Sequence, residues 1–111
     1  MCQNCGMDEV LRALADPSRR HLLDSLNERN GQTLRELCAS LSLARQSVSK
    51  HLAVLEAARL VATERRGREK LHFLNAEPIK AIAGHLLETY EHARSRPRYR
   101  WASRQELLDQ P

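Results

Sequence analysis

The stretch Leu41-Ser-Leu-Ala-Arg-Gln-Ser-Val-Ser-Lys-His-Leu-Ala-Val-Leu55 decides the fold of this chain. At about 100° per residue, its apolar residues fall on one side of a helix: Ala44, Val48, Leu52 and Leu55. The side chains on the other side are polar and rich in hydrogen-bond donors, and none before Glu56 is acidic. Arginine, lysine, glutamine and serine side chains pair with base edges and phosphates in the major groove of DNA. The pattern predicts a helix that packs through one face and contacts nucleic acid with the other.

A second helix is predicted immediately upstream, over residues 33–41. Thr33 and Glu36 have the spacing of a capping box, in which a hydroxyl and a carboxylate each accept a backbone N–H at the helix start. Leu34, Leu37 and Leu41 keep helical spacing. Two helices joined by a short polar link are typical of a helix-turn-helix.

Downstream, residues 60–74 have the pattern of two strands around Gly67. Glycine tolerates the positive φ that a tight hairpin requires. The tip is basic and carries Arg65, Arg66, Arg68 and Lys70. We therefore predict a wing that lies along phosphates or in a minor groove.

The first and last predicted helices carry wide apolar stripes for so small a domain. Val10, Leu11 and Leu14 form the first stripe, in a helix predicted from Asp8, and the second begins after Pro78 in a long helix predicted up to Pro97. A two-fold dimer would bury the excess and match a palindromic DNA site, whereas packing inside one monomer is the alternative. The predicted interface residues are Val10, Leu11, Leu14, Ile79, Ile82, Leu86, Leu87 and Tyr90.

We predict three segments: a flexible N-terminal tail over 1–7, a DNA-binding and dimerisation domain over 8–96, and a basic, aromatic extension over 97–111. Charge follows this division. Residues 43–75 hold seven Lys and Arg against three Glu, and residues 94–104 hold five Arg and no acid, although the net charge is only +4. Two basic stretches in an otherwise acidic chain indicate an oriented surface for a polyanion. Within the extension, Trp101 is expected to pack on the core or on the dimer interface.

Several classes of protein are disfavoured. No apolar run approaches the roughly 20 residues of a membrane span, and the N-terminus lacks a signal-peptide pattern, so we expect a cytoplasmic protein without a membrane partner. No nucleotide-binding glycine motif or hydrolytic constellation suggests an enzyme. A winged helix that docks on proteins instead of DNA is a different alternative, but its recognition face should lack base-reading residues.

Four segments together resemble the ArsR/SmtB family of bacterial repressors over about residues 8–92. They are Ala13-Leu-Ala-Asp-Pro-Ser-Arg-Arg-His-Leu-Leu23, Leu34-Arg-Glu-Leu37, Ser47-Val-Ser-Lys-His-Leu-Ala-Val-Leu55 and Arg66-Gly-Arg68. The resemblance implies a mainly α fold with a small β-hairpin, the winged helix-turn-helix, as a homodimer through its first and last helices. It also implies a repressor of a double-stranded DNA operator, commonly released by an inducer.

The expected DNA contacts combine the resemblance with the exposed pattern: Arg45, Gln46, Ser47, Ser49, Lys50 and His51, with the wing residues Arg65, Arg66, Arg68 and Lys70. The imidazole of His51 can hydrogen-bond either the scaffold or a phosphate, and both alternatives are open. Ala44 departs from the family pattern, where a Ser or Thr cap is usual. The recognition helix then lacks a side-chain cap unless Ser42 serves.

The two metal sites known in the family are incomplete here. Where metal-sensing relatives carry Cys-Val-Cys, this chain has Thr33, Leu34 and Arg35, which supply no thiolate. On the last helix, His85 and Glu88 have the spacing of a ligand pair, and His92 lies one heptad beyond His85, but the partner Asp-x-His is missing. We therefore expect solvated polar residues here and no zinc.

Cys2 and Cys5 form a Cys-x-x-Cys that can bind zinc or arsenite or form a redox pair. Two sulfurs fall short of the roughly four ligands of a structural zinc site, and Cys38 has the spacing of a core residue. We expect a repressor that needs no cofactor and whose DNA binding is independent of metal. The alternative is a metal- or thiol-responsive repressor that senses through Cys2 and Cys5.

Overall fold

The computed structural model describes residues 3–91, with side chains from residue 6 onward. The elements in chain order are α1 Gln3–Ala15, α2 Pro17–Glu28, α3 Leu34–Leu41, α4 Arg45–Ala57, β1 Val61–Arg66, β2 Glu69–Leu74 and α5 Glu77–Tyr90. The strands pair antiparallel, from Val61 opposite Leu74 to Arg66 opposite Glu69. This arrangement confirms the predicted winged helix-turn-helix.

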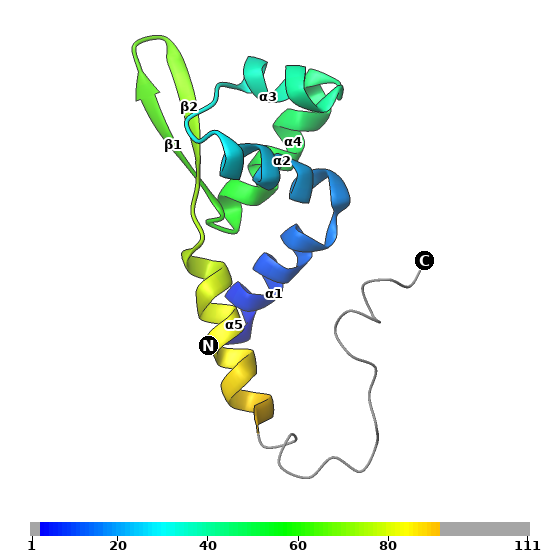
Figure 1. Cartoon of the computed structure of the whole chain (residues 1–111), viewed down its shortest axis with the longest axis vertical. Helices are drawn as coiled ribbons and strands as arrows, with labels where there is room; N and C mark the ends of the chain where they lie inside the picture. Colours follow the sequence, from blue (N-terminus) through cyan, green and yellow to red (C-terminus); the bar gives the residue numbers. More distant parts are fainter. Residues whose placement is uncertain (1–2, 92–111) are drawn as a thin grey trace.

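The elements separate into two ends of the molecule (Figure 1). Helices α2, α3 and α4 form one end together with the β1–β2 hairpin, whereas α1 and α5 cross at the opposite end. Contacts of α1 with α2, α4 and α5 join the two parts. The hairpin tip therefore lies far from α5.

The core lies between α2 and the two helices of the helix-turn-helix, α3 and α4. Its largest fully buried side chains include Leu22 and Leu26 of α2, Leu37 of α3, and Leu52 and Leu55 of α4. Each such side chain contributes about 1.5–3 kcal/mol by its removal from water. None of the described residues of α5 is buried, so this helix adds little to the core of a single chain.

Side-chain caps fix two helix starts, and the second of them confirms the predicted capping box. Asp16 precedes α2, and its Oδ1 accepts from the backbone N–H groups of Ser18 at 2.8 Å and Arg19 at 3.3 Å. Thr33 precedes α3, its Oγ1 accepts from the N–H of Glu36 at 3.2 Å, and Glu36 Oε1 accepts from the N–H of Thr33 at 2.9 Å. These bonds satisfy N–H groups that have no partner within the helix.

Helix α1 begins at a position different from the one predicted, and one residue predicted on the buried face of α4 is exposed. Helix α1 begins at Gln3 and not near Asp8; residues 3–7 contain no proline, the one residue that would strongly oppose a helix there. It therefore includes part of the segment predicted as a flexible tail. Helix α4 begins at Arg45, and Ala44 is its extended N-cap residue, with ψ of 145°. Ala44 is exposed, so its predicted place on the buried stripe is wrong.

Helix α5 ends at Tyr90. Its predicted continuation to Pro97, the boundary at residue 96 and the basic, aromatic extension lie outside the described residues. Within residues 3–91, no helix is both long and apolar enough to cross a membrane.

Candidate nucleic-acid interface

Helix α4 has the two faces that its sequence predicts. Val48, Leu52 and Leu55 are buried and fix the helix to the core. The predicted contact residues of its first two turns are all exposed: Arg45, Gln46, Ser47, Ser49 and Lys50. These side chains offer hydrogen-bond donors and two positive charges to solvent, which suits base edges and phosphates.

The first turn of α4 has no side-chain cap. Ala44 makes no capping hydrogen bond, and Ser42 instead ends α3 in the left-handed region, with φ of 56°. Ser42 therefore does not cap α4. Backbone N–H groups without a partner at a helix start attract anions, because the helix dipole is positive there. This end of α4 is electrostatically suited to a phosphate.

His51, the remaining predicted contact on α4, is half-buried and faces the scaffold. Its Nδ1 lies 3.4 Å from Arg19 Nη1, and because a guanidinium can only donate, Nδ1 is the acceptor. The same guanidinium donates to the carbonyl oxygens of Ala13 at 2.8 Å and Arg12 at 3.0 Å. Arg19 therefore connects the C-terminal end of α1 to α4 through Nδ1 of His51.

The wing consists of two six-residue strands joined by a turn at Gly67 and Arg68. Gly67 has φ of 65°, the conformation predicted for the tip. Arg66 pairs with Glu64 at 3.3 Å, and Lys70 pairs with Glu56 of α4 at 3.8 Å. The four predicted basic residues are exposed.

Buried hydrogen bonds fix the wing to the segment between α2 and α3. The N–H of His72 donates to the carbonyl of Gln32 at 2.8 Å, and the N–H of Gly31 donates to the carbonyl of His72 at 2.9 Å. The imidazole Nδ1 of His72 also donates to the Gln32 carbonyl at 3.0 Å. Both residues are buried, and sequence reasoning missed them, because a pairing across 40 positions leaves no local pattern.

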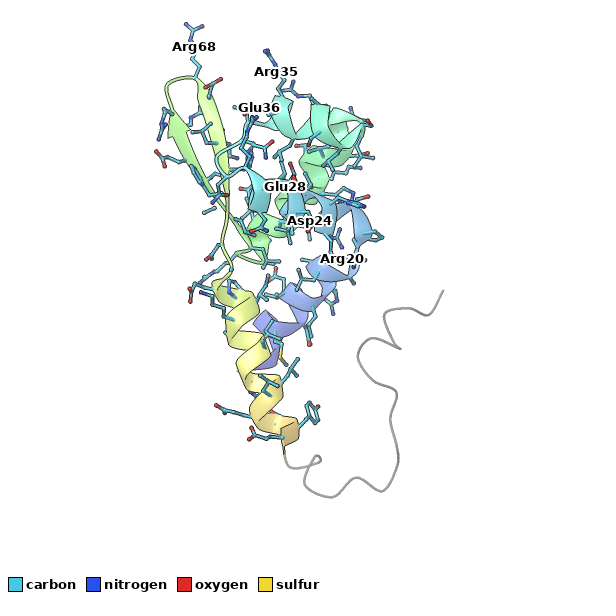
Figure 2. The ribbon with its side chains drawn as sticks, viewed as in Figure 1. Arg20, Asp24, Glu28, Arg35, Glu36 and Arg68 are labelled. Carbon is cyan, nitrogen blue, oxygen red and sulfur yellow. The ribbon has the colours of Figure 1, made fainter. Side chains whose placement is uncertain are left out.

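Arg35 is a second residue that sequence reasoning missed. It is exposed on α3 and lines a cleft together with Arg45 of α4 and Arg68 of the wing. Figure 2 shows Arg35 and Arg68 pointing outward at the same end of the molecule. The one sequence signal for this role is that Arg35 is a cation on the helix before the turn.

An ionised acid lies beside this cleft. The hydrogen bond from the backbone N–H of Thr33 holds the pKa of the Glu36 carboxyl below its ordinary value, with the nearby charge of Arg29 acting in the same direction against a smaller effect of burial. Glu36 is therefore a carboxylate at neutral pH that is already engaged by the cap and by Arg29.

The predicted dimer residues divide into exposed and core positions. Five are exposed: Leu11, Ile79, Leu86, Leu87 and Tyr90. Leu14 and Ile82 are partly buried against the core, and Val10 is 5% exposed and belongs to it. Val10 points into the monomer because α1 packs on α2 and α4 through this residue and Ala13. The exposed apolar face is therefore carried mainly by α5.

The described part of the chain holds no group of three or more residues able to bind a metal ion. At the start of α3, Thr33 is engaged in the cap, Leu34 packs against the core, and Arg35 is a cation. Cys38 is partly buried against the core. The side chains of Cys2 and Cys5, and also His92, lie outside the described residues.

Known proteins share this architecture. A family model described as a helix-turn-helix domain matches residues 14–64. The uncharacterized HTH-type transcriptional regulator YuzN of Bacillus subtilis is 43% identical over 85 residues, which cover 71% of this chain and 92% of that protein. The HTH-type transcriptional repressor SmtB of Mycobacterium tuberculosis is 42% identical over 85 residues, which cover 77% of this chain and 60% of the repressor.

The crystal structure of an ArsR family transcriptional regulator superposes with a TM-score of 0.74 at 32% identity, covering 87% of this chain and 100% of that one. The helix-turn-helix, the hairpin and these relatives agree: the chain belongs to the ArsR/SmtB family of winged helix-turn-helix transcriptional regulators, which are DNA-binding proteins and not enzymes.

Proposed function

We propose that this chain is a homodimeric repressor that binds a palindromic operator, with α4 in the major groove and the wing along the DNA backbone. The observation that carries the proposal is the exposed polar face of α4, held in place by Val48, Leu52 and Leu55. Hydrogen-bond donors on such a helix can read base edges, because the packed face fixes the helix backbone that carries them before DNA binds.

The exposed apolar face of α5 supports the homodimer. Leu87 and Tyr90 are 69% and 67% exposed, although large apolar side chains are normally covered in a soluble monomer when they lie side by side. A two-fold axis through α1 and α5 would cover them and present two copies of α4 to two half-sites.

Fluorescence anisotropy on DNA from upstream of its own gene tests the proposal. Gln46→Ala and Ser49→Ala should weaken binding to this DNA more than binding to random DNA of equal length. Asn27→Ala, an exposed polar residue on α2, is the matched control and should leave both unchanged. Equal losses on the two DNAs would remove Gln46 and Ser49 as base-reading residues.

We further propose that DNA binding is independent of metal, since the start of α3 carries a cap, a core leucine and a cation in place of ligands. The same anisotropy assay, repeated with zinc and with arsenite, tests this. Release of the DNA by either would assign sensing to Cys2 and Cys5, which a Cys2→Ser, Cys5→Ser double variant should then abolish.

A further inference from the structure

A cleft of about 810 Å³ lies between the start of α3, one face of α4 and the wing. It brings together segments that are separated in sequence, with Arg35 from α3, Arg45 from α4 and Arg68 from the turn of the hairpin. Leu52 and the buried His72 also line it. Because His72 is held by two hydrogen bonds to Gln32, one wall of the cleft is fixed.

The charges of the cleft are not balanced. Five cations and three carboxylates line it. Glu56 is paired with Lys70, and Glu36 is paired with Arg29, which lies outside the lining. Arg66 is paired with Glu64. Glu69 is the acid that remains.

Three lining arginines are left over. Among residues 6–91, no ion pair involves Arg35, Arg45 or Arg68. Each comes from a different element, so no local helix or hairpin contact explains why three cations gather here. All three side chains are exposed, so their guanidinium groups can donate to an anion that approaches this face of the molecule.

We propose that Arg35, Arg45 and Arg68 form a phosphate clamp that holds the DNA backbone beside the groove entered by α4. The proposal rests on the proposed function and adds α3 to the binding surface through Arg35. Guanidinium groups suit this ligand, because their planar donors match phosphate oxygens. The clamp supplies affinity for any DNA sequence and orients α4, whereas base reading stays with α4 itself.

Salt titration of DNA binding tests the clamp. Each phosphate contact contributes about 0.9 to the slope of log affinity against log salt. Arg35→Gln should lower the slope by about one unit, so that its affinity falls about 3-fold less than that of the wild type between roughly 50 and 200 mM salt. The loss should be equal on operator and random DNA. The double variant Arg35→Gln, Arg68→Gln should lower the slope by about two units.

Two controls separate the clamp from other effects. Lys80→Gln removes one cation from α5, which lies at the opposite end of the molecule from α3 and the hairpin tip (Figure 1), and should leave the slope unchanged. Arg35→Lys keeps the charge and should retain the wild-type slope. If the wild type binds DNA but Arg35→Gln keeps the full slope, the clamp is wrong and the proposed function stands. If the wild type does not bind double-stranded DNA, the proposed function itself fails.

Discussion

Gln32→Met should destabilise the protein by about 2 kcal/mol, because Gln32 holds the end of α2 together. The side chain is 4% exposed. Its Nε2 lies 3.0 Å from the Ser25 carbonyl, 3.1 Å from Ser25 Oγ and 2.7 Å from the Arg29 carbonyl. An amide nitrogen has two hydrogens, so the three contacts amount to two bonds. At about 1 kcal/mol for each buried hydrogen bond, methionine, which has a similar volume and no donor, loses about 2 kcal/mol.

Urea unfolding followed by circular dichroism measures this loss, at one protein concentration for all variants, because dimerisation would make stability depend on concentration. With an m-value of about 1–3 kcal/mol per molar, the midpoint should fall by about 1 M. Gln46→Met, at an exposed position of α4, is the control and should change stability by less than about 0.5 kcal/mol. Gln32→Glu should be worse than Gln32→Met, since a carboxylate would face the carbonyl oxygens of Ser25 and Arg29. A Gln32→Met midpoint equal to that of the control would refute the reasoning.

Three further predictions concern Arg19, Leu87 and Asp16. Arg19→Gln should lower operator affinity without changing the salt slope, because we expect Arg19 to position α4 through His51 and not to contact a phosphate. A reduced slope in the titration would instead make it a phosphate contact. Leu87→Glu should shift a dimer to monomer in analytical ultracentrifugation, and an unchanged dimer would exclude this face of α5. Burial raises the pKa of Asp16, but hydrogen bonds from two backbone N–H groups and the charge of Arg19 outweigh it, so the pKa lies below its ordinary value, as does that of Glu36. A lowered folded pKa gives stability that is complete above about pH 5 and is lost as pH falls below about 4, and Asp16→Asn should reduce this acid loss in urea midpoints measured against pH.

The features that sequence predicted correctly depend on residues close together in the chain. The capping box needs only Thr33 and Glu36, three positions apart, and the hairpin turn needs only Gly67 with strand formers on either side. Burial of Val48, Leu52 and Leu55 follows from helical periodicity alone. Local rules suffice for these features because the interactions that fix them are themselves local.

The features that sequence missed depend on where the fold brings distant segments together. Periodicity placed Val10 in a dimer interface, but the approach of α2 and α4 puts it in the core. The Gln32–His72 bridge spans 40 positions, and the contact between Arg19 and His51 spans 32. Arg35 gained its meaning only from the cleft that it shares with two other elements. None of these can be read from spacing, because each partner is set by tertiary packing.

In the proposed dimer, the pairing helices and the reading helix cannot move independently. Val10 and Ala13 of α1 are buried in the same core as Leu52 and Leu55 of α4, and packed cores transmit displacement because they contain few voids. Arg19 adds a polar link from the C-terminal carbonyls of α1 to His51. The separation of the two α4 helices would thus be set by how α1 and α5 pair, and must match half-sites about 34–36 Å apart. In the proposed dimer, a change in this pairing would therefore alter the separation of the two α4 helices without involving any residue that is proposed to contact DNA.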